Sequence, residues 1–206
     1  MSGLRERKKA ATRAALSWAA IRLTVERGYD NVLVDDVAEA AGVSARTFNN
    51  YFSSKAEAIA SRHLDRSLRL ADELRARPAD EPLWAAIRAA AMAQFEPGPE
   101  VEQAPPGDHA DWVSGLKVML AEPALQGEML RAVAAAEAEL AVAVAERTGT
   151  DVKQDLYPNL VAATVSAAIN TVMRQFVYAD SPVPMEQLLS DALSQLAAGL
   201  PVPAAR

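Results

Sequence analysis

The sequence of 206 residues contains no cysteine and only two histidines. The absence of cysteine excludes disulfides, thiolate metal sites and a cysteine nucleophile. His63 and His109 are far apart, and neither has a partner at a spacing typical of metal ligands, so we expect no metal site and no cofactor. The G-x-S-x-G, P-loop and G-x-G-x-x-G motifs are also missing, and the sequence therefore does not predict an enzyme.

Long hydrophobic runs are scarce as well. The basic residues near the N-terminus are not followed by the continuous apolar segment of a secretory signal. The longest uncharged run, Leu156 to Met173, approaches the length of a membrane span, but it contains Pro158 and several Asn, Ser and Thr residues. We interpret it as a buried helix of a soluble, cytoplasmic protein without a membrane partner.

The net charge of −6 hides an asymmetry along the chain. Residues 1–55 carry nine Lys and Arg against six Asp and Glu, whereas residues 56–206 carry twelve against twenty-one. A cationic first quarter indicates that only this part meets an anionic partner. Chance scatter of a few charges would give the same balance, so charge alone leaves the question open.

Glycine and proline divide the chain into segments whose apolar residues recur with helical periodicity, and no strand pattern is found. This predicts an all-α protein of about nine helices. The expected helices cover residues 5–27, 34–41, 45–51, 54–77, 82–95, 108–121, 123–148, 151–179 and 184–200. A loop rich in Pro, Gly and acidic residues is expected at 96–107.

Residues Val34 to Phe52 have the pattern of a helix, a tight turn at Gly42 and a second helix capped by Ser44. Phe48 and Phe52 would anchor the second helix. Its outward positions are Ala45, Arg46, Thr47, Asn49, Asn50 and Tyr51. Arg, Asn, Thr and Tyr hydrogen-bond base edges and phosphates, so the pattern favours double-stranded DNA as the partner. A helical hairpin with a solvated polar face would have the same pattern.

The stretch from Ala11 to Ile59 resembles the DNA-binding domain of TetR-type transcriptional regulators. The resemblance rests on residues 26–29, 34–38 and 41–44 and on Thr47-Phe48, Tyr51-Phe52 and Lys55. It implies a three-helix helix-turn-helix domain at 1–53 and a helical domain for effector binding and dimerisation at 54–206. It also implies a repressor that an effector releases from a pseudo-palindromic operator.

The resemblance implies roles for individual residues too. It makes Thr47, Tyr51 and Lys55 phosphate contacts, Ala45, Arg46 and Asn50 base contacts, and Asn49 either of the two. An N-terminal arm with Arg5, Lys8 and Lys9 would follow the DNA backbone or enter the minor groove.

Two positions depart from the family pattern. Leu33 stands where relatives usually have a Thr that caps the second helix, so that cap must come from elsewhere or be absent. Asn49 stands where relatives commonly have an aromatic residue, so the operator preference cannot be taken from a relative.

The remainder of the chain offers two candidate sites, a dimer interface and an effector pocket. The helix expected at 151–179 is apolar on more than one face, and the last expected helix has an apolar stripe of its own. An ordinary core would explain this as well as a dimer; the resemblance implies a homodimer through these two helices. Adaptable apolar side chains suit an effector pocket, although each is also a plausible core residue. The candidates are Met92, Phe95, Trp112, Leu116, Met119, Leu120, Met129, Tyr157, Met173 and Phe176.

Residues Leu116 to Leu130 are similar to a TetR subgroup whose C-terminal domain is associated with acyl-CoA-like ligands, so the expected effector is small, apolar and acyl-CoA-like. Two alternatives remain from the residues alone. One is a non-enzymatic carrier or sensor of an acyl or lipid-like ligand that acts without DNA, and the other is a small helical-bundle enzyme.

Overall fold

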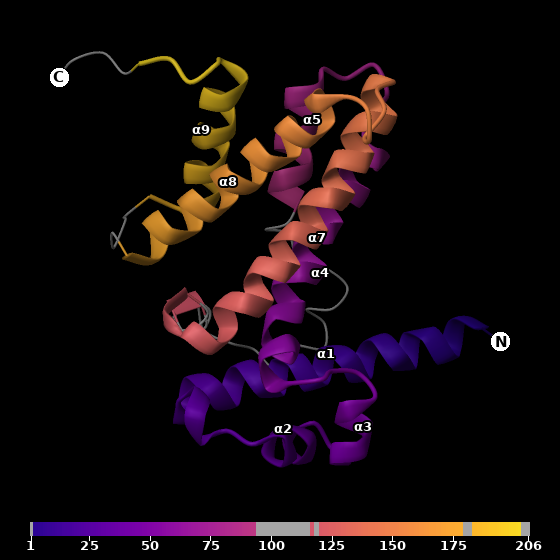
Figure 1. Ribbon diagram of the computed structural model, residues 1–206, viewed down its shortest axis with the longest axis vertical. Coiled ribbons are helices and arrows are strands. Elements are labelled where there is room, and N and C mark those ends of the chain that lie inside the picture. The colour runs from indigo at the N-terminus through magenta and orange to yellow at the C-terminus, as the bar shows by residue number, and fades with distance from the viewer. Residues whose placement is uncertain (1, 94–115, 118–119, 179–182, 203–206) are drawn as a thin grey trace. The chain divides into compact units, whose positions relative to one another are not determined.

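The computed structural model describes residues 2–93, 116–117, 120–178 and 183–202. Within these ranges the chain forms eight α-helices and one short 3-10 turn, and no strand (Figure 1). The prediction of an all-α fold is confirmed. The chain divides into two compact units: unit 1 comprises residues 1–65 and 97–132, and unit 2 comprises residues 66–96 and 133–206. The domain boundary expected between residues 53 and 54 stays a prediction.

Unit 1 begins with a long helix, α1 (Ser2–Arg27), which is followed by the turn η1 (Tyr29–Asn31). Two short helices, α2 (Val34–Ala40) and α3 (Ala45–Asn49), lead into the first half of α4 (Lys55–Ala76). One face of α1 is fully buried against these elements. The core residues are Leu16, Ala20, Leu23, Val37, Phe48, Phe52 and Ile59.

Unit 2 contains the end of α4, α5 (Leu83–Ala93), most of α7 (Pro123–Thr148), α8 (Leu156–Tyr178) and α9 (Met185–Ala197). The last helix packs against both α5 and α8. The core has large aliphatic side chains at its centre and alanines where helices approach closely, including Leu74, Ile87, Ala90, Leu140, Val144, Val165 and Leu193. This core fixes one face of α8 and leaves the opposite face to solvent.

Two predicted boundaries are wrong in informative ways. The helix expected from Asp151 begins only at Leu156, because the Asp151 carboxylate accepts the backbone N–H groups of Lys153 and Gln154 at 2.7 and 3.1 Å and closes a turn. The first helix begins at Ser2 rather than near Arg5. The loop expected at 96–107 and most of the helix expected at 108–121 lie outside the described residues.

The length and composition of α8 would allow it to cross a membrane, and a third of its most apolar window is buried within the structure. The core helix of a soluble protein passes the same test. Val161, Val165 and Val172 of this helix belong to the core of unit 2, which supports the interpretation of α8 as a core helix.

Ion pairs join neighbouring segments of unit 2. Arg75 of α4 donates to Glu139 at 2.6 Å and to Glu146 at 2.8 Å, both on α7. Arg77 and Glu81 form a two-pronged pair, with nitrogen–oxygen distances of 2.7 and 2.9 Å. The hydrogen bonds from the Arg77 guanidinium hold the pKa of the Glu81 carboxyl below its usual value.

Candidate nucleic-acid interface

The turn between α2 and α3 is built around Gly42. Its φ is +69°, in the left-handed region that favours glycine. The N–H of Val43 donates to the carbonyl of Ala38 at 2.9 Å, and the N–H of Gly42 donates to that of Glu39 at 2.9 Å. This pair of bonds is a Schellman motif, which ends α2 and redirects the chain at once into α3.

Ser44 starts α3 as the sequence predicted. Its backbone is extended, with φ −83° and ψ 157°, and its hydroxyl oxygen accepts the N–H of Thr47 at 3.1 Å. The hydroxyls of Ser44 and Thr47 lie 3.0 Å apart. The cap therefore fixes the first turn of α3, which is the turn that carries Arg46.

The inner side of α3 is anchored by an aromatic pair. Phe48 and Phe52 are both buried, and their ring centroids lie 5.8 Å apart with the planes tilted by 52°. The Arg13 guanidinium of α1 lies 5.4 Å from the centre of the Phe52 ring and pairs with Asp65 of α4. These contacts hold α3 firmly, so its outward side chains have a defined position.

The outward side of α3 is polar and accessible. Arg46, Asn49 and Asn50 are exposed, whereas Ala45, Thr47 and Tyr51 are half-buried. Among the described residues, Arg46 makes no hydrogen bond or ion pair. Figure 1 shows α2 and α3 together along one side of α1. The face thus presents a free guanidinium and two carboxamides on a short, rigid helix.

The basic N-terminal residues are helical and do not form an extended arm. Arg5, Lys8 and Lys9 are exposed in the first turns of α1, spaced so that they share one face. The helix extends past α2 and α3 in Figure 1. A helix about 10–12 Å wide is broader than a minor groove about 6 Å wide, so only the long side chains of this helix, and not its backbone, could enter that groove. Contact with the DNA backbone and contact with the minor groove both remain predictions.

The N-terminus of α2 is capped although position 33 is Leu and not Thr. The Leu33 side chain offers no acceptor and is 64% exposed. The carboxylate of Asp36 instead accepts the backbone N–H of Leu33 at 2.8 Å. This bond is one half of a capping box, and the half that a Thr at position 33 would supply is missing.

Lys55 lies in a different environment from the exposed phosphate contact that the resemblance implied. It is half-buried, and its ammonium donates to the main-chain oxygens of Tyr29 and Val32. The same nitrogen lies 4.0 Å from the centre of the Tyr29 ring. Burial raises the pKa of Tyr29, and the negative charges of Glu122, Asp30 and Glu128 raise it further. In the sequence, Tyr29 is part of the family motif, and no further signal indicates this contact.

The described effector candidates are distributed over both units. In unit 1, Leu116 is buried, and Leu120 and Met129 are half-buried. In unit 2, Met173 is buried, Met92 and Phe176 are half-buried, and Tyr157 is exposed. Phe95, Trp112 and Met119 lie outside the described residues. The pocket assignment stays a prediction.

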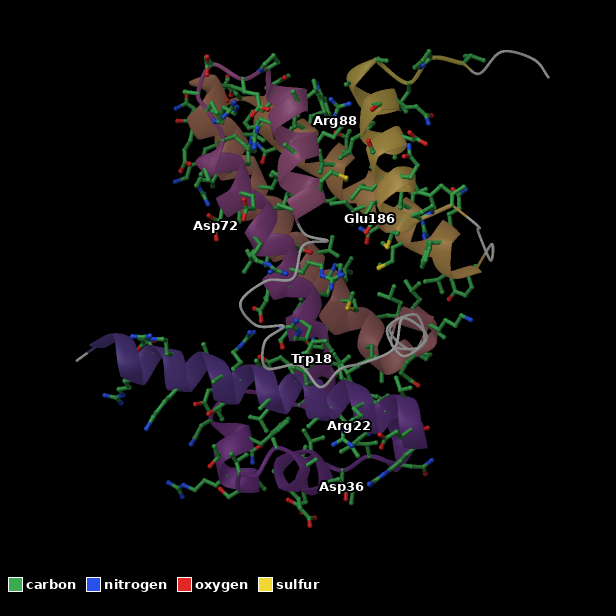
Figure 2. All side chains as sticks on the ribbon, turned by 180° about the vertical axis from the view of Figure 1, so that it is seen from behind. Trp18, Arg22, Asp36, Asp72, Arg88 and Glu186 are labelled. Atoms are coloured by element: carbon green, nitrogen blue, oxygen red, sulfur yellow. The ribbon has the colours of Figure 1, made fainter. Side chains whose placement is uncertain are left out.

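A buried cluster of two serines links helices of unit 1. Ser17 and Ser61 are buried and both donate to the carbonyl of Ala58, at 2.6 and 2.8 Å, which ties α1 to α4. Figure 2 shows the side chains of both units, including Trp18 on α1. Across the described ranges, no three His, Asp or Glu side chains gather as a metal site requires.

Comparisons with known proteins agree with this geometry. Residues 18–60 match the family described as bacterial regulatory proteins, tetR family, and residues 81–201 match the MftR C-terminal domain. The HTH-type transcriptional regulator TcmR of Streptomyces glaucescens is 33% identical, over 84% of this chain and 76% of its own length. The putative mycofactocin biosynthesis transcriptional regulator MftR of Mycobacterium tuberculosis is 30% identical, over 94% of this chain and 93% of its own length. A crystal structure from Syntrophomonas wolfei, titled as a TetR-family regulator, superposes with a TM-score of 0.63 at 18% identity, covering 95% of this chain and 98% of that one.

Proposed function

Because this chain belongs to the TetR family of bacterial transcriptional regulators, we propose that it is a homodimeric repressor that a small apolar effector releases from its operator. The chain is a DNA-binding regulator and not an enzyme. The observation that carries the proposal is the exposed Arg46, whose side chain has no partner in the described ranges, on a helix that the Ser44 cap and the buried Phe48 hold rigid. The alternative carrier that acts without DNA does not account for this face.

Base recognition falls to the exposed residues of α3. A guanidinium such as that of Arg46 reads O6 and N7 of guanine, and the carboxamides of Asn49 and Asn50 suit N6 and N7 of adenine. The half-buried side chains of this face suit other contacts: Ala45 suits a thymine methyl, and Thr47 and Tyr51 suit phosphate oxygens.

The exposed basic face of α1, formed by Arg5, Lys8 and Lys9, would follow the DNA backbone. Such contacts give affinity without sequence preference. Through these contacts the basic residues of the first quarter of the chain would meet the phosphates, although the whole protein is acidic.

Dimerisation is proposed through α8 and α9. The first turns of α8 expose a cluster of large apolar side chains, with Leu156 75%, Leu160 53% and Tyr157 47% exposed, while Val161 and Val165 on the other face are buried. Apolar residues gathered on one accessible face typically mark an interaction surface. A second copy of the chain would cover it and provide the second α3 for an operator half-site one helical turn away, roughly 34–36 Å.

The effector is proposed to bind the C-terminal domain, among the apolar residues named above. Buried Met173 and half-buried Met92 and Phe176 are adaptable side chains of unit 2 and the strongest described candidates. Tyr157 fits the exposed dimer face better than a pocket wall. An acyl-CoA-like molecule is the effector that we propose to test first. Any effector must bind the DNA-free conformation more tightly than the DNA-bound one. We place the protein in the cytoplasm, because its family is one of soluble regulators.

The test starts from random duplex DNA, so that no operator is assumed. The full-length protein should enrich a sequence with two related half-sites, and sizing of the complex should give two protomers per duplex. Fatty acyl-CoAs of several chain lengths are then titrated against the preformed complex. Failure to enrich any duplex would refute the DNA-reading face, and insensitivity to every acyl-CoA would refute the proposed effector class alone.

A further inference from the structure

The contacts of Lys55 do not match those of a DNA anchor. We propose that Lys55 is a positioning residue that does not contact a phosphate. It holds residues 29–32, the segment before α2, against the start of α4, and the ring of Tyr29 is its partner. This inference rests on the DNA-binding function above and assigns a different task to one residue of that face.

The ammonium of Lys55 is already engaged inside the protein. One N–H is directed at the carbonyl oxygen of Val32, at 2.8 Å, and another at that of Tyr29. Its charge lies 4.0 Å from the centre of the Tyr29 ring. Two of the three N–H donors of a lysine are therefore directed at main-chain oxygens, and the charge has an aromatic partner. Only one N–H is left for a phosphate, and moving the ammonium towards DNA would cost the contacts already made.

The two oxygens belong to the segment that leads into the helix-turn-helix. Tyr29 opens the turn η1, the N–H of Val32 donates to the carbonyl of Tyr29 at 3.3 Å, and α2 starts two residues later at Val34. Val32 is itself 1% exposed. Withdrawal of the ammonium towards DNA would leave these oxygens without their charged donor, which is unfavourable for acceptors next to a core.

Lys55 is also the first residue of α4. This helix is continuous, and its first half belongs to unit 1 and its second half to unit 2. Since Lys55 ties residues 29–32 to the first turn of α4, a displacement of that turn must also move the start of α2. The Schellman turn at Gly42 then carries the displacement from α2 to α3. The lysine thereby sets the position of the reading helix without touching DNA.

The salt dependence of DNA binding separates the two roles. A phosphate contact contributes about 0.9 to the slope of log K against log salt, so its loss from both protomers of a dimer lowers the slope by about 2. Lys55→Met, measured on the duplex that the wild-type protein enriches, should weaken binding about tenfold or more with an unchanged slope, because the binding-competent arrangement is less populated. Lys9→Met is the matched control: it removes an exposed charge from the same unit and should lower the slope. A slope that falls by about 2 for Lys55→Met would overturn the inference.

Variants of Tyr29 provide a second, independent test. Tyr29→Leu removes the ring but no charge, and it should reproduce the weaker binding at unchanged slope, whereas Tyr29→Phe keeps the ring and should bind as the wild type does. If Lys55→Met does not fold, Tyr29→Leu still decides, since wild-type affinity in that variant would refute a positioning role. Urea unfolding of the single and double variants tests the contact without DNA: additive losses of stability would also refute it. A wild-type protein that enriches no duplex would instead count against the DNA-reading face.

Discussion

Replacing Arg46 by alanine is the most direct test of which side chain reads the operator. Arg46 lies in the first turn of α3, is exposed and has no partner among the described residues. Its removal should therefore leave the fold intact. The variant should melt at the wild-type temperature, because an exposed substitution away from caps and cores changes stability by less than about 0.5 kcal/mol.

The size of the effect follows from the contact that is lost. A two-pronged guanidinium–guanine contact is worth about 1–3 kcal/mol of discrimination. Each half-site should thus lose about 5- to 150-fold in specific affinity, since 1.4 kcal/mol is a factor of ten. Preference should relax at a single base pair in each half-site and remain at the others.

The assay measures binding to a library of single-base changes in the enriched duplex, for the wild type and for Arg46→Ala. Arg88→Ala is the matched control, because Arg88 is an exposed arginine of α5 whose side chain contacts Ser194 at 3.4 Å within unit 2 (Figure 2). It changes the net charge by the same amount. The control should keep the wild-type preference at every position.

Two results would refute the reasoning. A uniform loss across the library would make Arg46 a phosphate contact instead of a base reader. No loss at all would mean that the exposed face of α3 does not enter the groove, and the orientation argued from the Ser44 cap would then be wrong.

Three further substitutions test other parts of the structure. Leu33→Thr should stabilise the protein by about 0.5–1 kcal/mol in thermal melting, because it completes the capping box with Asp36, and Leu33→Ala, which adds no acceptor, should not. Glu81→Gln should lower the melting temperature at pH 7, and the difference from the wild type should shrink as the pH falls below the ordinary carboxyl pKa of about 4.3: Arg77 holds the pKa of Glu81 low, so its contribution is fully present above that value and is lost as the pH falls through the lowered pKa. A difference that stays constant as the pH falls from 7 to 3 would contradict this linkage. Leu160→Asp should give a monomer on sizing while keeping its helical circular dichroism, and a persisting dimer would move the interface away from the start of α8.

The periodic segments of the chain were predictable because their signals are local. The all-α class was confirmed, and the starts of α2, α3 and α7 fall at the expected residues. Glycine at a position that requires positive φ, as at Gly42, and a hydroxyl that caps the next helix, as at Ser44, depend on only a few neighbouring residues. The resemblance to TetR-type regulators rested on these same short-range features and is confirmed by the comparisons.

The exact start of a helix and the conformation of a charged segment were not predictable, because apolar periodicity contains no information on competing hydrogen bonds. At Asp151 the side chain competes with the helix for backbone N–H groups and delays the start of α8 to Leu156. At the N-terminus the sequence indicated charge but not conformation, and the structure shows that Arg5 and Lys9 lie in a helix instead of an extended arm.

The sequence alone determined that this is a helical protein with a helix-turn-helix, because turn chemistry and apolar spacing act within a few residues. Tertiary structure decided what individual polar side chains do. Asp36 replaces the missing cap at Leu33, and Lys55 contacts Tyr29 and Val32, residues that precede it by 26 and 23 positions. Whether a lysine is directed at solvent or at a carbonyl depends on which oxygens the packed chain brings within reach, and a pattern read along the sequence does not contain those distances.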